Sequence, residues 1–168
     1  MFWDWWQSLF TDMPAYAFFN FKFLPKYGSA VIQGVEYTLI LSVVSVLLAV
    51  LPALLLATMR LSRCTPIRWL SGAYIAIFRS TPMLVQLMII YFGVFFYIPV
   101  PKVMLFGFID STRFIPGVTA LALNSAAYVA EIFRAGILAV DSGQMEAARS
   151  LGLSQKQSMQ LVILPQAI

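Results

Sequence analysis

Long apolar stretches separated by short polar connections dominate the chain. The clearest stretch runs from Tyr37 to Met59 and contains no charged residue. About 20 helical residues, each rising about 1.5 Å, are needed to cross a hydrocarbon core about 30 Å thick. Pro52 lies inside the stretch, but membrane helices tolerate proline as a kink. We therefore expect the first transmembrane helix over residues 37–59.

The second apolar stretch, residues 69–97, is interrupted by the sequence Arg79-Ser80-Thr81-Pro82. It can form a single long tilted helix with a kink at the proline. Alternatively, residues 69–78 lie at the membrane surface and only residues 83–100 cross the bilayer. We favour the single helix, because residues 69–78 lack the strongly polar face of a surface helix.

The third stretch covers residues 116–139 and contains Asn124, Glu131 and Arg134. Residues 141–160, which follow it, are polar, mixed in charge and too amphipathic to span a membrane. The pattern therefore predicts three transmembrane helices with one polar segment after the third.

The first 34 residues are rich in aromatic side chains but lack an uninterrupted apolar span of about twenty residues. They also lack the basic start and apolar centre of a signal peptide. Because Trp and Tyr favour the membrane–water boundary, we expect residues 1–34 to form an interfacial segment and residues 35–168 a transmembrane domain. A disordered leader explains the first segment equally well.

The composition indicates an all-α integral membrane protein. Hydrophobic residues make up 61% of the 168 positions and charged residues 11%, whereas soluble domains are about 45–50% apolar and about 25% charged. The chain has no histidine, one cysteine (Cys64) and no glycine followed by lysine. It lacks the residues of common metal sites and of a phosphate-binding loop, so we expect no metal, no cofactor and no enzymatic activity of its own.

Basic residues indicate the orientation in the membrane. The connection between the first two spans contains Arg60, Arg63 and Arg68 and no acidic residue, which is typical of a cytoplasmic loop. Three crossings then place the N-terminus and residues 98–115 outside and residues 141–160 inside. The net charge of +4 fits basic loops that face anionic membrane lipid, and we expect no nucleic-acid binding.

Residues 142–165 have the pattern of two short helices joined by a bend. Asp141 or Ser142 can cap the first helix, and Gly152 suits the left-handed residue that closes it. Ser154, with Gln157 three residues later, predicts a capping box for the second helix. A plain amphipathic connector on the membrane surface explains the pattern as well. Apolar positions share one face of each helix: Met145, Ala148 and Leu151 in the first, and Met159, Val162 and Ile163 in the second.

Three motifs resemble those of a known family. Glu146-Ala147-Ala148, three residues, Gly152, nine residues, Val162, one residue and Leu164-Pro165 resemble the EAA loop of ABC-importer permeases, E-A-A-x3-G-x9-I-x-L-P, with valine in place of isoleucine as the one departure. The run Phe78-Arg79-Ser80-Thr81-Pro82, with Leu84 and Gln86, resembles the second-helix signature of polar amino-acid permeases. Tyr128-x-x-Glu131-Ile132-x-Arg134-Ala135-Gly136-Ile137 is similar to the segment that precedes their EAA loop. The resemblance covers about residues 34–168.

The resemblance implies the MetI-like permease fold and a transmembrane subunit of a bacterial inner-membrane importer of polar amino acids. It implies pairing with a second permease subunit, identical or homologous, and delivery of substrate by an extracytoplasmic binding protein. Cytoplasmic ATPase subunits would hydrolyse ATP and dock on the loop. The coupling residues that it implies are Glu146, Ala147, Ala148, Gly152, Leu164 and Pro165.

Family members usually have about five transmembrane helices, two of them after the EAA loop. The resemblance therefore implies that this chain is truncated at its C-terminus. The alternative function is a non-transporting, membrane-anchored interaction protein or an inactive permease fragment.

Charged residues at membrane depth suggest a substrate path. In the expected helices Arg79 and Glu131 lie about 15 Å and about 12 Å from the cytoplasmic side, and an unpaired charge there is costly. We hypothesise that the two side chains pair or jointly face the translocation path; the alternative is a local bond between Glu131 and Arg134. Asn124, Tyr128 and Glu131 recur with helical spacing, either as a site in which Glu131 meets an α-ammonium and Arg79 a carboxylate, or as interhelical hydrogen bonds.

Overall fold

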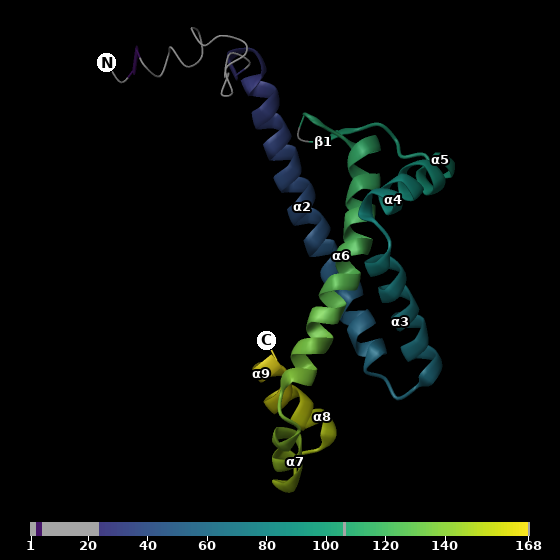
Figure 1. The fold of residues 1–168 in the computed structure, drawn as a ribbon, viewed down its shortest axis with the longest axis vertical. Helices are drawn as coiled ribbons and strands as arrows, with labels where there is room; N and C mark the ends of the chain where they lie inside the picture. Colours follow the sequence, from purple (N-terminus) through teal and green to yellow (C-terminus); the bar gives the residue numbers. More distant parts are fainter. Residues whose placement is uncertain (1–2, 5–23, 106, 168) are drawn as a thin grey trace. The chain divides into compact units, whose positions relative to one another are not determined.

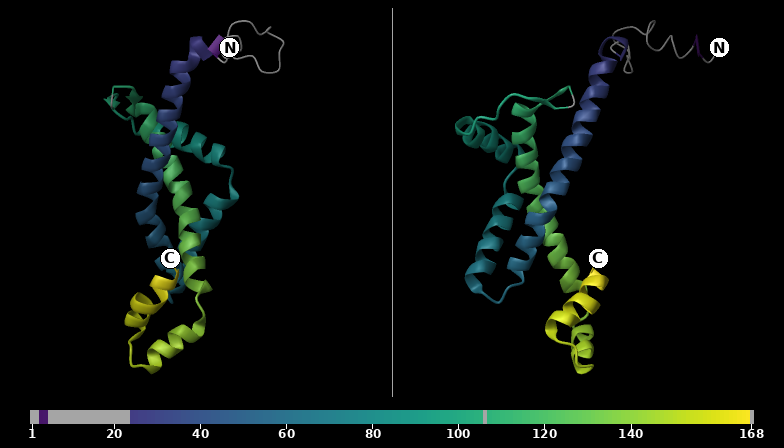
Figure 2. Two further views of the ribbon diagram at one scale, coloured as in Figure 1. Left: turned by 90° about the vertical axis from the view of Figure 1, so that its left-hand side faces the viewer. Right: turned by 180° about the vertical axis from the view of Figure 1, so that it is seen from behind.

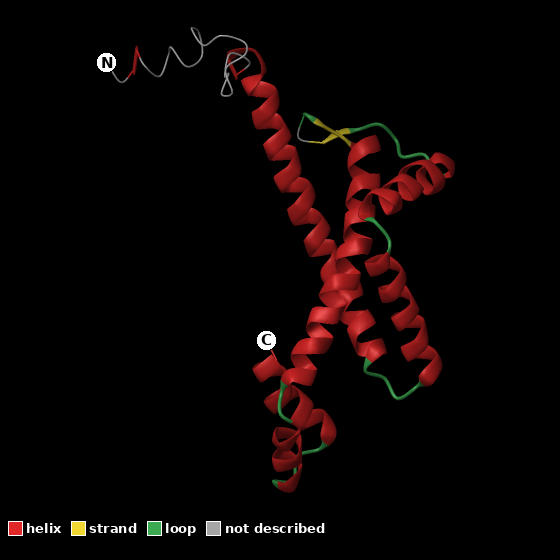
Figure 3. Ribbon diagram, viewed as in Figure 1, coloured by secondary structure: helices red, strands yellow, loops and turns green. Residues whose placement is uncertain are grey.

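The computed structural model describes residues 3–4, 24–105 and 107–167. The chain forms two compact units, Met1–Leu41 and Ser42–Ile168, and all candidate site residues lie in the second. The elements, shown in Figures 1 and 3, are α2 (Leu24–Arg60), α3 (Thr65–Ser80), α4 (Met83–Met88), η1 (Ile89–Val94), α5 (Phe95–Tyr97), β1 (Met104–Leu105), β2 (Ile109–Asp110), α6 (Ser111–Ala139), α7 (Ser142–Ser150), α8 (Gln155–Ser158), η2 (Met159–Ile163) and α9 (Leu164–Ala167).

Two helices of the described part, Lys26–Arg60 and Ser111–Ala139, are long and apolar enough to cross a membrane. Both begin earlier than the sequence predicts. The described part of α2 begins at Leu24, and Pro25 is compatible with a first helical turn, where a missing N–H costs nothing. The predicted interfacial segment therefore ends in helix over residues 24–34, and residues 5–23 of it lie outside the described residues.

The second apolar stretch is broken, and the prediction of one continuous helix over residues 69–97 is wrong. Helix α3 and the helix formed by residues 83–97 meet at an angle of 106°. Pro82 removes a helical N–H and forces the residue before it into extended geometry, as Thr81 shows with φ −100° and ψ 141°. Counted as one span, the bent pair would be the third crossing.

Small residues form the core of the Ser42–Ile168 unit. Ala49, Ala53 and Ala57 lie one turn apart along α2 and are buried against Ala126 and Ala130 of α6. Small side chains let helix backbones approach closely in a membrane, where packing replaces the hydrophobic effect between helices. Many large side chains of the same stretch of α2 are exposed, as expected for a surface in contact with lipid: Val43, Val46, Leu47, Leu48, Leu51, Leu54 and Leu55.

A short hairpin precedes α6. Strands β1 and β2 are antiparallel, with Met104 opposite Asp110, and Gly107 has a φ of +79° in the turn. Ser111 holds the base of the hairpin, because its Oγ donates to the Pro101 carbonyl at 2.7 Å and accepts from the Val103 N–H at 2.8 Å. Helix α6 begins at Ser111 because the Asp110 carboxylate caps it.

The Asp110 cap makes the hairpin sensitive to acid. Its Oδ1 accepts from the Thr112 hydroxyl at 2.6 Å and from the Thr112 N–H at 2.9 Å. These hydrogen bonds, led by that of the hydroxyl, hold the pKa of Asp110 below its ordinary value, and Lys102 and Arg113 add to the effect. The cap is therefore fully formed above the unfolded pKa and is lost as the pH falls through the folded pKa.

We expect a spin label at Val103, in a Cys64→Ser background, to gain mobility as the pH falls below the ordinary titration range of an aspartate and Asp110 is protonated. The Asp110→Asn variant is the control, because asparagine caps a helix comparably and does not titrate there. Its spectrum should stay the same between pH 7 and pH 3. Equal pH dependence in both proteins would contradict the assignment to Asp110.

Candidate functional site

The polar segment after α6 is a helix, a bend and a second helix, as the sequence predicts. Asp141 caps α7 by accepting from the Gly143 N–H at 2.6 Å. Gly152 closes the bend with a φ of +88°, a conformation that costs other residues about 1–2 kcal/mol. Ser154 and Gln157 form the predicted capping box of α8. Asp141, rather than Ser142, is the cap.

The three apolar residues at the predicted positions of the first helix differ in exposure. Ala148 is buried and Met145 partly buried, but Leu151 is 85% exposed. Leu151 is the C-cap residue, with φ −80° and ψ 6°, so it stands at the end of the helix where the bend begins. Glu146 and Ala147 are also exposed. The bend therefore presents a large apolar side chain at its tip.

The second helix of the segment returns to the membrane helices. The whole segment lies at the C-terminal end of α6 in every view of Figures 1 and 2. A hollow of about 260 Å³ separates α9 from α2 and α6; it is lined by Leu54, Ala57, Thr58, Phe133, Ile137, Leu164 and Ala167. At Gly136 the helices nearly touch, because a Cβ there would lie 2.6 Å from the Ala167 carbonyl oxygen. Of the predicted coupling residues, Leu164 therefore lies at this junction, while Pro165 is exposed.

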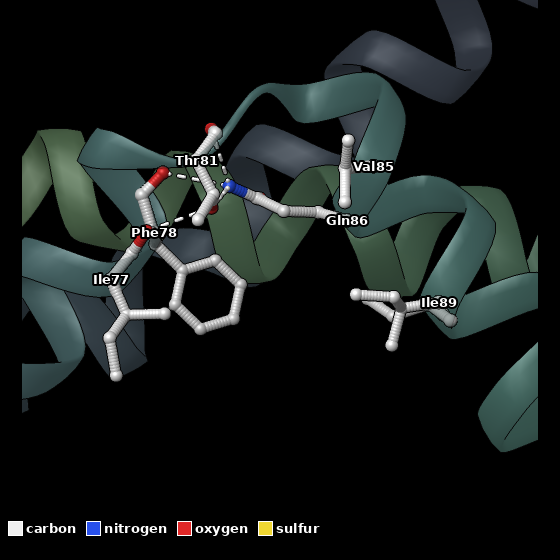
Figure 4. Close-up of a pocket in the computed structure, with 7 residues that line it drawn as sticks. Ile77, Phe78, Thr81, Val85, Gln86 and Ile89 are labelled. Carbon is white, nitrogen blue, oxygen red and sulfur yellow. Dashed lines mark hydrogen bonds between the residues drawn. The ribbon is translucent and has the colours of Figure 1, made fainter.

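A buried carboxamide occupies the break between α3 and α4. Gln86 is 7% exposed, and its Nε2 donates to the carbonyls of Phe78 at 2.8 Å and Thr81 at 3.0 Å and to the Thr81 hydroxyl at 2.7 Å, as Figure 4 shows. Its Oε1 accepts from Asn124 Nδ2 of α6 at 2.9 Å. Asn124, a predicted substrate-path residue, is thus committed to a hydrogen bond between helices.

An apolar hollow of about 240 Å³ lies beside this carboxamide. It is lined by Ile77, Phe78, Thr81, Val85, Gln86, Ile89 and Ile90. The break therefore combines an apolar recess with a fully hydrogen-bonded polar group.

The four predicted substrate-path residues do not form one cluster. Arg79 contacts Tyr128, whereas Asn124 and Glu131 each bind a residue outside the four. The Arg79 guanidinium lies 5.5 Å from the centre of the Tyr128 ring, a cation–π contact between α3 and α6. Glu131 binds Arg134 on its own helix: Arg134 Nε donates to Glu131 Oε1 at 3.0 Å, and Nη2 contacts the same oxygen. In the described part of the chain the local pair is formed and the direct Arg79–Glu131 pair is not. Residues three positions apart on one helix lie side by side, so the Glu131–Arg134 pair forms without any contact between helices.

The sequence interpretation missed two features of this region. The sequence motif includes Gln86 but assigns it no role. Pro82, four residues after Phe78, does indicate that the Phe78 carbonyl lacks its helical donor. The buried alanines of α2 and α6 repeat every four residues, which is a recognisable packing pattern. The described residues also contain no group of three His, Cys, Asp or Glu side chains arranged to hold a metal ion.

Comparisons with known proteins agree with this architecture. A family model described as "Binding-protein-dependent transport system inner membrane component" matches residues 45–168. The arginine transport system permease protein ArtQ of Bacillus subtilis is 42% identical over 137 residues, which cover 82% of this chain and 58% of ArtQ. The glutamate/aspartate import permease protein GltK of Escherichia coli is 38% identical over 145 residues, covering 81% of this chain and 60% of GltK.

A solved structure is also similar. The crystal structure of an amino acid ABC transporter with histidines contains a chain with a TM-score of 0.73 and 44% identity, covering 86% of this chain and 63% of that one. This chain spans about three fifths of the length of the curated relatives that it matches. Because the family model matches well over half of the sequence, the chain belongs to the binding-protein-dependent transport system inner membrane components, as an integral membrane protein related to the permeases of amino-acid ABC transporters.

Proposed function

We propose that the chain acts as a transmembrane permease subunit of an ABC importer for polar amino acids, and that its α7–α9 segment is the docking site of a separate ATPase subunit. The observation that carries the proposal is the construction of this segment. One end exposes Leu151 and the left-handed Gly152 on the protein surface, and the other end packs on α6 at Gly136. A docked subunit could therefore move α6 through a short rigid connection.

The same proposal assigns partners and orientation. The segment faces the cytoplasm of a bacterial cell, the N-terminus lies outside, and ATP hydrolysis takes place on the partner. A second permease subunit, identical or homologous, and an extracytoplasmic binding protein complete the system. Arg60 at the end of α2, Arg63 in the connection and Arg68 in the first turn of α3 support this orientation, because basic residues favour the cytoplasmic face. The similarity to amino-acid permeases supports transport, and not the alternative of a non-transporting interaction protein.

The pairs at the α3–α6 contact suggest how an amino acid is held. Arg79 is exposed and placed by the Tyr128 ring, so its guanidinium can take an α-carboxylate. Arg134 contacts Glu131 through Oε1 alone, which leaves Oε2 for an α-ammonium. Asn124 contributes indirectly, by holding Gln86 at the break.

The Gly152→Asp variant tests the docking proposal. Aspartate at a φ of +88° strains the bend and adds bulk and charge beside Leu151, so we expect the captured ATPase to fall at least tenfold, which corresponds to about 1.4 kcal/mol of binding free energy. The measurement is the amount of nucleotide-binding subunit that co-purifies with the tagged protein from its native membranes, identified by its sequence.

The matched control is Gly107→Asp, which makes the same substitution at a φ of +79° in the hairpin turn before α6, outside the docking segment. This variant should capture the ATPase as the unsubstituted protein does. If the unsubstituted protein captures no nucleotide-binding subunit, the proposed function is wrong.

A further inference from the structure

We propose that Gln86 is a positioning residue: its carboxamide replaces the N–H that Pro82 lacks and thereby fixes the 106° bend that holds Arg79 against Tyr128. The consequence for transport rests on the proposed function, whereas the bend itself does not. Neither the family signature nor the similarity to permeases assigns this role to the glutamine.

The first step is the loss of a backbone donor. In an uninterrupted helix the Phe78 carbonyl would accept from the N–H of residue 82, but residue 82 is a proline. The neighbouring Ile77 carbonyl keeps its partners, since Thr81 donates to it from its N–H at 3.2 Å and from its hydroxyl at 2.8 Å. The Phe78 carbonyl is therefore the group that the proline deprives of its donor.

The second step is the replacement of that donor across the break. Gln86 lies in α4, yet its Nε2 reaches back to the Phe78 and Thr81 carbonyls at the end of α3. In a straight helix Gln86 would lie about 6 Å beyond Pro82 along the axis, and Pro82 is itself four residues beyond Phe78. Only a sharp bend brings the Gln86 side chain back to the end of α3. At membrane depth, where water is absent, an unsatisfied carbonyl is strongly unfavourable, so the hydrogen bonds hold the bend.

The third step connects the bend to α6. Asn124 Nδ2 donates to Gln86 Oε1 at 2.9 Å, which sets the orientation of the carboxamide so that its NH2 group faces α3. Tyr128 stands one turn beyond Asn124 on α6, and Arg79 follows Phe78 on α3. The two segments that Gln86 joins are thus the two that carry the cation–π pair, and release of the bend should separate that pair.

The bend can be measured directly by the distance between two spin labels. Cys64 is the chain's one cysteine, so a Cys64→Ser background allows labels at Ala76 of α3 and Phe96 of α5, both exposed. In lipid bilayers the unsubstituted protein should give one narrow distance distribution. Gln86→Leu, which keeps the size of the side chain but removes the carboxamide, should give a broader distribution shifted to longer distances.

A second substitution makes the test independent of whether Gln86→Leu folds. Pro82→Ala restores the backbone N–H, so in the combined Pro82→Ala, Gln86→Leu protein the Phe78 carbonyl again has its helical donor, in addition to the longer hydrogen bond of 3.4 Å from Asn124 Nδ2. This protein should accumulate normally and give a narrow distribution at a longer distance, that of a straighter helix. The control Leu84→Ala changes a side chain of α4 that is 69% exposed and should leave the distance unchanged.

Uptake provides the functional readout. Gln86→Leu should raise the KM for the amino acid at least tenfold while the captured ATPase stays the same, because the docking segment is untouched. An unchanged distance in Gln86→Leu, a combined variant with the bend of the unsubstituted protein, or a changed distance with an unchanged KM would overturn the proposal. If the unsubstituted protein shows no uptake, the proposed function fails, and the distance measurement still decides whether Gln86 holds the bend.

Discussion

Replacement of Ala53 by leucine is expected to force α2 away from α6 and to destabilise the Ser42–Ile168 unit by about 1–3 kcal/mol. Ala53 has no exposed surface and belongs to the same packed cluster as Ala126 and Ala130. Three additional carbon atoms have no space between backbones that approach this closely. The measurement is the free energy of unfolding in mixed micelles with increasing denaturing detergent.

The matched control lies two residues away, on the opposite side of the same helix. Leu51 is 77% exposed, so Leu51→Ala should change the free energy of unfolding by no more than about 0.5 kcal/mol. Removal of volume elsewhere in the cluster should compensate for the added leucine, and Ile75→Ala combined with Ala53→Leu should be less destabilised than the sum of the two single changes. A neutral Ala53→Leu variant would show that the buried alanines do not set the helix separation.

We expect Gly136→Ala to weaken the packing of α9 on α6, although replacing glycine by alanine usually stabilises a helix. Alanine is the better helix former by about 1 kcal/mol, but its Cβ would lie 2.6 Å from the Ala167 carbonyl oxygen, a backbone atom that cannot turn aside. Helix α9 must therefore shift away from α6. If α9 transmits the motion of the ATPase, as the proposed function requires, amino-acid uptake per ATP hydrolysed should fall about tenfold, equivalent to about 1.4 kcal/mol.

The position of α9 can be followed without transport. A spin label at Gln166, in the Cys64→Ser background, should become more mobile in Gly136→Ala, whereas ATPase capture through the Leu151 tip should persist. Gly34→Ala is the matched control, because nothing lies within 4 Å of a Cβ at that position, and it should leave both measurements unchanged. Unaltered mobility and uptake in Gly136→Ala would contradict the role of this contact in coupling.

The features that the sequence predicted correctly depend on neighbours along the chain. The Asp141 cap, the left-handed Gly152 and the Ser154–Gln157 capping box each involve residues within a few positions of one another. The apolar runs likewise predicted the spans of α2 and α6, although both helices start earlier, α6 because the Asp110 cap begins it at Ser111. Such local signals need no knowledge of which helices meet.

Other features could not be obtained from local patterns. The sequence does not predict the sharp bend at Pro82, because proline in a membrane helix can either kink the helix or end it. The outcome depends on whether another group donates to the carbonyl that proline leaves without a hydrogen bond. Here Gln86 does so together with Asn124, a residue 38 positions away. The Arg79–Tyr128 contact depends in the same way on how α3 lies against α6.

The sequence by itself determined the apolar centres of α2 and α6 and the caps of α7 and α8, because these follow from the polarity of the side chains and from hydrogen bonds within one turn. Its motifs also indicated the family. Only the tertiary structure decided the 106° bend, the local pairing of Glu131 with Arg134 in place of Arg79, and the close approach of Ala167 to Gly136. These outcomes depend on distances between helices. The separation of α2 and α6 is set by the packing of small residues from both helices, and neither segment alone contains that information.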